Sequence, residues 1–405
     1  MRILVFSSLF PSAAAPTAGT FIRERAFRVA KNAPMVVVAP QPWSPVDWLI
    51  RRFRRSFRPQ AVDYEVMDGI EIHRPRYLSV PGVFKRLDGR LMAAGAMPVV
   101  RRLARSFRPD LIDAHFLYPD GYAASLVAAR LGLPLVVTLR GSKDQNLLGT
   151  DRERFLRRAI GAASRVVTVS DALRRDVAMP LLGGSDARIA VVPNGVDIDR
   201  FRPVDRGEAR QRLGLPTGAP VLIGVGNLVT GKGFQRVIPM LPALRRQHPG
   251  LRYLIVGGGA THGDMAEPLA ALARAHGVAD CVTLCGAQPQ ESLKWYYGAA
   301  DLFVLATERE GWANVFLEAM ACGIPVVTTD VGGNREVVAD PAVGTVVPYW
   351  DASAFQVAIT QALARRWDRD AIRGYAKGHG WDQRISTLMA LFAELVSAKD
   401  KKEER

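Results

Sequence analysis

The stretch DLFVLATEREGWANVFLEAMACGIPVVTTD, residues 301–330, contains the pattern that decides the fold. It begins with the apolar run LFVLA at 302–306, which predicts a buried strand. A helix is expected to begin at about Asn314, a good N-cap residue, and to stop at Gly323. The run PVVTT at 325–329 then predicts the next strand. A strand, a helix and a strand in this order are typical of an α/β protein with a parallel sheet.

Apolar runs of the same kind recur along the whole chain, with helix-like segments between them. Because they are continuous and β-branched rather than strictly alternating, they indicate parallel strands that are buried on both faces. In the first half they lie at 3–6, 35–39, 111–114, 135–139, 165–169 and 189–193. In the second half they lie at 221–226, 253–257, 282–286, 302–306, 325–329 and 344–348.

The second series of strands restarts after the loop VPNGVDIDRF and a segment rich in Pro and Gly at 202–220. This restart predicts two Rossmann-like, doubly wound domains in tandem, whose loops at the carboxyl ends of the strands face a shared cleft. The segment 381–396 is expected to form a long amphipathic helix that crosses back to the first domain. The predicted boundaries are 1–200 for the first Rossmann-like domain, 201–380 for the second, and 381–405 for the last helix and a charged tail.

Composition restricts the class of protein. With 48% apolar and 23% charged residues, the chain has the balance of a soluble globular protein. Its three cysteines cannot form a disulfide framework and suit a reducing, cytoplasmic compartment. No apolar stretch reaches the roughly 20 residues of a membrane-spanning helix. The first residues, MRILVFSSLFPSAAAP, resemble a short signal peptide, but MVVVAP follows at βαβ spacing and favours a first strand.

The formal net charge of +15 has one local concentration, in the segment from Trp48 to Arg58. Arginine and aromatic side chains alternate there, a pattern that suits an anionic membrane surface. A loop with solvated arginines is a second interpretation. Nucleic acid is a third, but no nucleic-acid motif accompanies the cluster, so we expect no such partner. The residues are Arg51, Arg52, Arg54, Arg55 and Arg58, with Trp48, Phe53 and Phe57 between or beside them.

The segment around the predicted helix start also contains the residues for a chemical function. The free N–H groups and the dipole of a helix that begins near Asn314 form a site for an anion such as a diphosphate. Glu310 precedes this helix, and Glu318 lies about one turn inside it. Because carboxylates accept hydrogen bonds from pairs of vicinal hydroxyls, the two glutamates suit a sugar and a ribose on either side of that diphosphate.

The stretch EGWANVFLEAMACGIPVV (310–327) resembles the glutamate–seven–glutamate motif of the family 4 retaining glycosyltransferases, which have the two-domain GT-B fold. The wording is most similar to bacterial exopolysaccharide or teichuronic-acid type transferases, and the resemblance covers nearly the whole chain. It implies that Glu310 contacts the hydroxyls of the transferred sugar and Glu318 the ribose of the nucleotide. It also implies that donor oxygens are bound by the backbone around Gly311, Trp312, Asn314 and Val315.

The stretch VGNLVTGKG (225–233) resembles the family loop with a phosphate-binding lysine, here Lys232. A lysine in a glycine-rich loop can meet a pyrophosphate as a point charge. The chain departs from the family at Asn227, where an arginine is usual. Either Lys232 takes more of the charge of the leaving group, or another residue such as Arg236 replaces the missing cation.

Three segments of the first half also resemble the family. PTAGTFIRERA (16–26) places Gly19 in a loop where the backbone can approach the donor phosphates. LIDAHFLYPDG (111–121) contains the expected active-site histidine, His115. VTLRGSKDQN (137–146) contains the acceptor-side residues Arg140 and Asp144, with Lys143 inserted before the aspartate. An Asp-x-Asp metal motif is absent near these segments, so no metal or other cofactor is expected.

The resemblance therefore implies a retaining hexosyltransferase with Glu310, His115 and Lys232 as catalytic residues. The expected partners are a nucleoside-diphosphate sugar and a lipid-linked or oligosaccharide acceptor, at the inner face of a cell membrane. A GT-B epimerase or phosphorylase is one alternative. A catalytically silent protein of the same fold, which binds a sugar nucleotide or a polyanion, is another.

Overall fold

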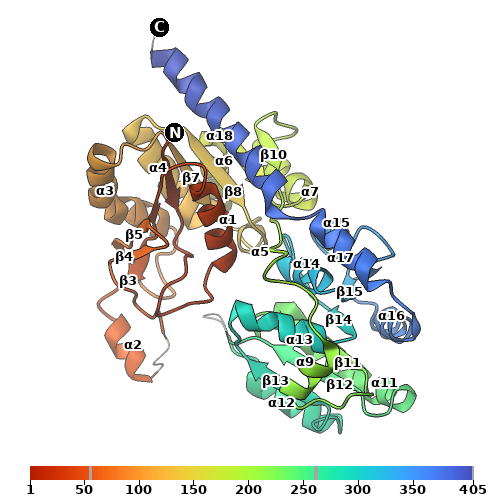
Figure 1. Cartoon of the computed structure of the whole chain (residues 1–405). Coiled ribbons are helices and arrows are strands. Elements are labelled where there is room, and N and C mark those ends of the chain that lie inside the picture. Colours follow the sequence, from red (N-terminus) through yellow and green to blue (C-terminus); the bar gives the residue numbers. More distant parts are fainter. Residues whose placement is uncertain (54–56, 260–262, 404–405) are drawn as a thin grey trace. The chain divides into compact units, whose positions relative to one another are not determined.

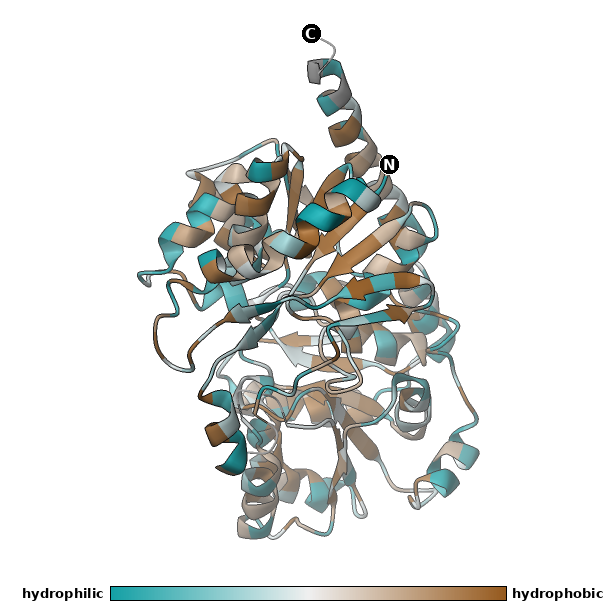
Figure 2. Ribbon diagram, turned by 90° about the vertical axis from the view of Figure 1, so that its left-hand side faces the viewer, coloured by the Kyte–Doolittle hydropathy of each residue, from teal (hydrophilic) through white to brown (hydrophobic). Residues whose placement is uncertain are grey.

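The computed structural model describes residues 1–53, 57–259 and 263–403. The chain forms two compact units. Unit 1 consists of residues 1–194 together with the last segment from Trp381 onward, and unit 2 consists of residues 195–380. Unit 1 is built on a mainly parallel sheet and unit 2 on a fully parallel one, each with helices packed around it, and many of the strands are hydrophobic along their length (Figures 1 and 2).

Unit 1 contains an eight-stranded sheet in the order β10-β9-β8-β7-β1-β2-β5-β4. All of its strands pair in parallel except β4, which is antiparallel to β5. The six runs predicted for the first half of the chain are confirmed as strands. They are β1 (Ile3–Phe6), β2 (Met35–Val38), β7 (Leu111–His115), β8 (Leu135–Leu139), β9 (Arg165–Thr168) and β10 (Ile189–Val191).

The first strand, β1, settles the two interpretations of the opening residues in favour of a strand. It pairs with β2 on one side and β7 on the other, and all four of its side chains are fully buried. Four further strands were not predicted. They are β4 (Tyr64–Met67) and β5 (Ile70–His73) at the sheet edge, and the separate pair of β3 (Gln41–Trp43) with β6 (Arg76–Leu78).

The helices of unit 1 include one from the far end of the chain. Helix α18 (Trp381–Glu403) packs against α1 (Thr20–Ala30), and Trp381, Leu388 and Phe392 join the core of β1 and β2. The remaining helices are α2 (Asp47–Phe53), α3 (Asp88–Ser106), η1 (Leu117–Gly121), α4 (Tyr122–Leu131), α5 (Ser142–Gln145), α6 (Glu153–Ala162), α7 (Asp171–Leu173), η2 (Arg174–Ala178) and α8 (Met179–Leu182).

Unit 2 contains a six-stranded, fully parallel sheet in the order β13-β12-β11-β14-β15-β16. The six runs predicted for the second half are all confirmed. They are β11 (Val221–Val225), β12 (Arg252–Val256), β13 (Val282–Gly286), β14 (Leu302–Leu305), β15 (Val326–Thr329) and β16 (Gly344–Val347).

The helices of unit 2 connect these strands in the βαβ manner. They are α9 (Arg206–Arg212), η3 (Thr230–Lys232), α10 (Phe234–Val237), η4 (Ile238–Met240), α11 (Leu241–Gln247), α12 (Ala266–Ala275), η5 (Gln290–Ser292), α13 (Leu293–Ala299), α14 (Asn314–Ala321), α15 (Asn334–Val337), α16 (Ala352–Ala364) and α17 (Arg369–Lys377).

The strand order reverses once in each sheet, and the reversal fixes where a ligand binds. In unit 2 the chain winds outward from β11 in one direction and from β14 in the other, so the switch point lies between these two strands. In unit 1 it lies between β1 and β7. Ligands of doubly wound sheets bind outside the carboxyl ends of the strands at such points. The loops that follow β1, β7, β11 and β14 are therefore the ones to examine.

Candidate active site

In unit 2, the loops after β11 and β14 are fastened to each other. The carbonyl of Gly231 accepts hydrogen bonds from the backbone N–H of Glu308 (2.8 Å) and the hydroxyl of Thr307 (2.9 Å). Gly233 has a φ of +77°, and a Cβ added there would lie 1.8 Å from the carbonyl oxygen of Ala306. Only glycine fits this contact. The two loops are thus joined at the switch point by hydrogen bonds and by one close backbone contact.

Two predicted catalytic side chains, one from each of these loops, are in contact. The Nζ of Lys232 is ion-paired with Oε1 of Glu310, which also lies 3.4 Å from the hydroxyl oxygen of Thr307. The lysine side chain is 25% exposed and the glutamate side chain 11% exposed. Both are therefore partly shielded from water but still open to a ligand, and each holds the other in place.

The helix start beside this pair differs in one detail from the prediction. Helix α14 begins at Asn314 as expected, but the N-cap position is taken by Ala313, and no side chain caps the helix. The expectation that Asn314 is the N-cap is therefore wrong by one residue. Because a side-chain cap would occupy one of the free N–H groups of the first turn, its absence favours binding of an anion there.

The predicted donor-binding residues on either side of this start are mostly covered. Gly311 and Trp312 are buried, while Val315, like Asn314, is half-buried. Within the described ranges the indole Nε1 of Trp312 is buried without a hydrogen-bond partner. An unsatisfied buried donor is costly and is available to an acceptor group of a ligand.

Glu318 lies on α14 as predicted, and its orientation depends on a residue that the sequence did not reveal. The hydroxyl of Tyr297, from α13, donates a 2.9 Å hydrogen bond to Oε2 of Glu318. Tyr297 is fully buried, and burial together with the neighbouring Glu318 raises the pKa of its hydroxyl well above the usual value. The tyrosine therefore remains a proton donor and fixes the carboxylate.

At Asn227, where the family usually has an arginine, no other arginine takes the place of the missing cation in an obvious way. Asn227 is exposed, in the loop after β11. Arg236, the suggested substitute, is held by the carbonyl of Ala306 (3.1 Å), the hydroxyl of Tyr349 (2.7 Å) and, at 3.6 Å, the carboxylate of Glu308. These contacts occupy its guanidinium, so the geometry favours Lys232 as the principal cation of the site.

In unit 1, Gly19 lies in the loop between β1 and α1, as predicted. It is the N-cap residue of α1, with a φ of +71°, and an added Cβ would lie 2.4 Å from the carbonyl oxygen of Leu9. The close approach that this glycine permits in the structure is thus to another part of the same loop.

His115 ends strand β7 and is completely buried. Its Nδ1 lies 3.4 Å from Nε and 3.3 Å from Nη2 of Arg140, so this nitrogen accepts and the proton resides on Nε2. Burial, followed by the charges of Arg140 and Arg25, lowers the pKa of the imidazole well below its usual value. His115 is therefore neutral near pH 7, and in the described part of the chain its Nε2 has no hydrogen-bond partner.

Around His115 lies a buried polar cluster that the sequence revealed only in part. Arg140 donates a 2.7 Å hydrogen bond to Oδ1 of Asn194, which lies in the loop VPNGVDIDRF after β10. Arg25 forms a bidentate salt bridge of 2.9 and 2.8 Å with Asp113, and both are buried. Asp113 interrupts the apolar run LIDAH, and a charged residue in a buried strand is the signal that could have predicted a buried cation beside it.

Asp144, the other predicted acceptor-side residue, is also completely buried. Its Oδ1 accepts a 2.9 Å hydrogen bond from the backbone N–H of Leu117, which fastens α5 to the segment after β7. Burial raises the pKa of this carboxyl to about 7. The side chain is thus close to half protonated at neutral pH.

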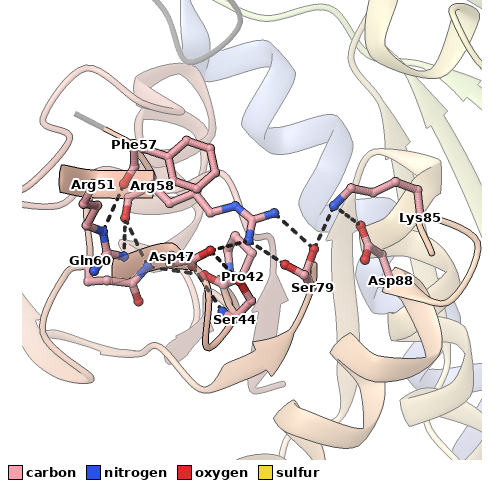
Figure 3. Close-up of polar contacts among 10 residues, drawn as sticks. All are labelled: Pro42, Ser44, Asp47, Arg51, Phe57, Arg58, Gln60, Ser79, Lys85 and Asp88. Carbon is pink, nitrogen blue, oxygen red and sulfur yellow. Dashed lines mark hydrogen bonds and ion pairs between the residues drawn. The ribbon is translucent and has the colours of Figure 1, made fainter. Parts of the chain in front are cut away.

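The basic segment is only partly the free cationic surface that we expected. Arg54 and Arg55 lie outside the described residues. Arg51 donates to the carbonyls of Phe57 and Arg58 (both 3.1 Å), and Arg58 points inward to Asp47 (3.4 Å) and to Ser79 (Figure 3). These two arginines therefore hold the segment in place.

The remaining residues of the segment present another surface. Arg52 is exposed on α2, and beside it Trp48 and Phe53 are 68% and 81% exposed. Single exposed apolar side chains are common on protein surfaces, but contiguous apolar patches mark contact sites.

Over residues 1–53, 57–259 and 263–403, no three His, Cys, Asp or Glu side chains are grouped so as to hold a metal ion. In the same ranges, no helix has the length and apolar character needed to cross a membrane.

Two doubly wound units, with polar residues concentrated at the switch point of each sheet, are the architecture of the GT-B fold. Comparison with known proteins agrees. The family model "Glycosyltransferase Family 4" matches residues 45–200, and "Glycosyl transferases group 1" matches residues 205–379. The chain is 33% identical over 342 residues to the teichuronic acid biosynthesis glycosyltransferase TuaC of Bacillus subtilis, covering 82% of each chain. The chain therefore belongs to glycosyltransferase family 4.

Solved structures share the fold. Sucrose-phosphate synthase of Thermosynechococcus elongatus superimposes with a TM-score of 0.79 at 19% identity, covering 98% of this chain and 99% of that one. HepE of Anabaena, solved in complex with UDP and glucose, gives a TM-score of 0.69 at 20% identity, with 98% and 99% covered. These similarities support the GT-B fold that the sequence predicted.

Proposed function

We propose that this protein transfers a sugar from a nucleoside-diphosphate sugar to an acceptor hydroxyl, with retention of the anomeric configuration. The observation that carries the proposal is the Lys232–Glu310 ion pair beside the uncapped start of α14, at the switch point of unit 2. It combines a cation, a helix start without a side-chain cap and a carboxylate, which are groups that suit a diphosphate and sugar hydroxyls.

In this proposal the donor rearranges the existing ion pair. The diphosphate becomes the counter-ion of Lys232 and accepts from the first N–H groups of α14. Glu310, released from the lysine, then accepts hydrogen bonds from hydroxyls of the transferred sugar. Glu318, already oriented by Tyr297, accepts from the ribose hydroxyls. Gly311, Trp312, Asn314 and Val315 line the path between the two carboxylates.

The proposed reaction is a front-side displacement. The bond between the anomeric carbon and the diphosphate oxygen breaks, and both electrons go to the diphosphate. The acceptor oxygen forms the new bond on the same face, and its proton passes to a diphosphate oxygen. Lys232 and the α14 start stabilise the developing negative charge, which is the principal contribution that the protein makes to the rate. Water must be excluded, because it would hydrolyse the donor.

The polar cluster of unit 1 is proposed to act on the sugar and the acceptor. His115 is neutral with its proton on Nε2, so it can donate a hydrogen bond to a sugar hydroxyl but is not a strong acid. Arg140 orients this imidazole. Asp144, with a pKa of about 7, can accept a proton or a hydrogen bond from an acceptor hydroxyl. Gly19 remains a proposed donor-side residue.

The comparisons support, for the partners, a uridine nucleotide and a polysaccharide or glycolipid product. HepE, of the same fold, was solved with UDP and glucose, and the Bacillus relative is named for teichuronic acid biosynthesis. We therefore place UDP-sugars first among donors and a lipid-linked or oligosaccharide intermediate of cell-surface polysaccharide assembly first among acceptors. We propose that no metal ion or other cofactor takes part.

A donor screen tests the proposed function. The purified chain is incubated with UDP-, GDP- and ADP-sugars, with and without EDTA, and release of the nucleotide is measured. We expect release from one nucleotide class, unaffected by EDTA, and an α-linked product from an α-linked donor by NMR. Binding of a nucleotide without turnover of any donor would favour the catalytically silent protein. Turnover that requires inorganic phosphate would favour a phosphorylase.

We also propose that the exposed face of α2 binds an anionic membrane surface from the cytoplasmic side. Trp48 and Phe53 supply amphipathic and apolar area, and Arg52 supplies charge. The solvated-loop interpretation remains the alternative, because Arg51 and Arg58 serve the fold rather than the surface.

Vesicle flotation distinguishes these two interpretations. The triple substitution W48S/R52Q/F53S removes the exposed groups and leaves Arg51 and Arg58 in place. We expect the wild type to float with vesicles that contain phosphatidylglycerol and not with neutral vesicles, and the variant to lose most of this binding. Equal flotation of the two proteins would contradict the proposal. R274Q, which removes one exposed arginine of unit 2 and so the same net charge, is the control.

A further inference from the structure

A basic cavity lies at the amino ends of the unit 2 strands, whereas the candidate donor site lies at their carboxyl ends. It has a volume of about 360 Å³ and is lined by residues that immediately precede strands: Pro220 before β11, Asp301 before β14 and Pro325 before β15. These are the amino ends of the strands, whereas Lys232 and Glu310 follow carboxyl ends. Nothing in the proposed transfer reaction uses this cavity.

Charge in the cavity is strongly unbalanced. Its lining contains a single carboxylate, Asp301, and five guanidinium groups. Asp205 and Asp368, next to Arg206 and Arg369 in sequence, are not part of this lining. Their carboxylates accept hydrogen bonds from backbone N–H groups at the starts of α9 and α17. The five arginines are Arg206, Arg210, Arg365, Arg366 and Arg369.

Three of these arginines share the same carboxylate. Asp301 is ion-paired with Arg206, with Arg210 at 2.7 Å, and with Arg369 at 3.9 Å. One carboxylate is therefore the shared counter-ion of three guanidinium groups, and two positive charges are left without a counter-charge in the lining. Burial, and then the charges of Arg369 and Arg210, lower the pKa of Arg206 to about 10. At neutral pH all three remain protonated, so their mutual repulsion persists.

The three guanidinium groups differ in how fully they are bound. Arg210 is buried and serves the fold, because it also donates to the carbonyls of Ala299 (3.0 Å) and Thr217. Arg206 and Arg369 are about two-fifths exposed at the mouth of the cavity. In the described part of the chain, Nε of Arg206 is buried and has no hydrogen-bond partner.

We propose that this cavity is a second anion site, which binds a compact phosphate-type anion, a diphosphate in particular, between Arg206 and Arg369. Planar guanidinium groups match phosphate oxygens in a bidentate manner, and the volume of about 360 Å³ is at the lower end of small-ligand pockets. The anion supplies the negative charge that Asp301 alone does not. Arg366, exposed at the rim, adds a more distant charge. This inference is independent of the proposed function.

Isothermal titration calorimetry with inorganic pyrophosphate tests the site. Because pyrophosphate can also bind at Lys232, the full-length K232Q variant is the reference, and NaCl holds the ionic strength constant. We expect saturable binding in K232Q and at least a tenfold loss of affinity in K232Q/R206Q/R369Q. The matched control is K232Q/R274Q/R335Q, which removes two exposed arginines away from the cavity and so carries the same net charge. It should bind like K232Q.

Other outcomes decide against the site. Equal weakening of pyrophosphate binding in the two triple variants would mean that binding depends only on net charge. This result would overturn the proposal. Tighter binding of hexaglutamate than of pyrophosphate would overturn it in favour of an acidic protein partner. If R206Q/R369Q fails to fold, as judged by circular dichroism, K232Q/R366Q keeps the test open. Arg366 is exposed, and its removal should weaken pyrophosphate binding about threefold; an unchanged affinity would contradict the site.

Discussion

Both units have polar residues at the carboxyl ends of the strands beside the switch point. The two sets of residues differ in their burial and in how many partners hold them. In unit 1, Arg25, Asp113, His115 and Arg140 are buried and bound to one another. In unit 2, the Lys232–Glu310 pair is still partly exposed and shares few contacts.

This difference separates stability from function. A buried charge that loses its partner costs several kcal/mol, whereas a partly exposed one can turn to water. Substitutions at the strand ends of unit 1 should therefore reduce stability first. Substitutions at those of unit 2 should reduce activity first and leave the fold almost unchanged. The four predictions below test this separation, in order of decreasing effect.

The largest effect is expected for Asp113→Ala. It leaves the buried guanidinium of Arg25 without its carboxylate, which should lower the free energy of unfolding by about 3–5 kcal/mol. Urea denaturation followed by circular dichroism measures this. Asp151→Ala, which breaks an exposed ion pair with Arg86 in the same unit, is the control and should cost less than about 1 kcal/mol. Similar losses in the two variants would break the comparison.

Next comes Glu310→Gln. It keeps an oxygen for Lys232 and Thr307 but removes the charge proposed to bind sugar hydroxyls. We expect kcat/KM for the donor to fall by about 10²–10³, with the free energy of unfolding changed by about 1 kcal/mol or less. The control is Glu308→Gln, the same chemical change two residues earlier, for which activity should stay within about threefold. A large loss of stability in E310Q without loss of activity would reverse the comparison.

A third, smaller effect concerns pH. The pKa of Asp144 is raised to about 7 in the folded unit, above its ordinary value of 3.8. The stability due to its neutral form is therefore complete below about pH 4 and is lost as pH rises through about 7. Asp144→Asn cannot ionise, so its stability relative to the wild type should increase by on the order of 2 kcal/mol between pH 5 and pH 8.

Thermal unfolding of both proteins across this pH range measures the difference. A constant difference would show that Asp144 is already ionised at pH 5. Comparison within a pair removes the titration of all other groups, which the two proteins share.

The smallest effect should follow from Asn227→Arg. It restores a second cation beside Lys232 in an exposed position, so the fold should tolerate it. We expect KM for the donor to fall about threefold to tenfold, with little change in kcat, since a cation that binds ground and transition states equally lowers only KM. Asn227→Gln is the uncharged control. An unchanged KM in N227R would show that Lys232 and the helix start already satisfy the diphosphate.

Local pattern was enough to predict the twelve strands from continuous apolar runs and the start of α14 from its sequence. It failed at β3 and β6, two three-residue strands that contain Pro, Arg and exposed apolar residues and that pair with each other. The hydrogen bonds of such a strand come from a partner far along the chain, which no local composition reports. The hairpin of β4 and β5 was missed for a different reason. Asp68 and Gly69, both with positive φ, form the turn between two alternating runs, and this local signal was overlooked.

The candidate site shows the same limit. Glu310, Glu318 and Lys232 were found because they stand within recognisable motifs. The residues that hold the predicted side chains in place by hydrogen bonds were not predicted. Tyr297 lies 21 residues from Glu318, and Asn194 lies 54 residues from Arg140. Such pairings are created by the fold, so a sequence pattern cannot specify them without an additional signal such as the buried Asp113.

The composition of unit 1 has a consequence for synthesis on the ribosome. Its core includes Trp381, Leu388 and Phe392 from α18, together with Ile3 and Val5 from β1. When residue 194 has left the exit tunnel, this core still lacks its last helix, and all of unit 2 must be translated before that helix emerges. Unit 2, which is continuous in sequence, can complete its fold first, although domains usually fold in the order of translation. A nascent chain stalled before Trp381 would expose an apolar face of unit 1 to chaperones and proteases.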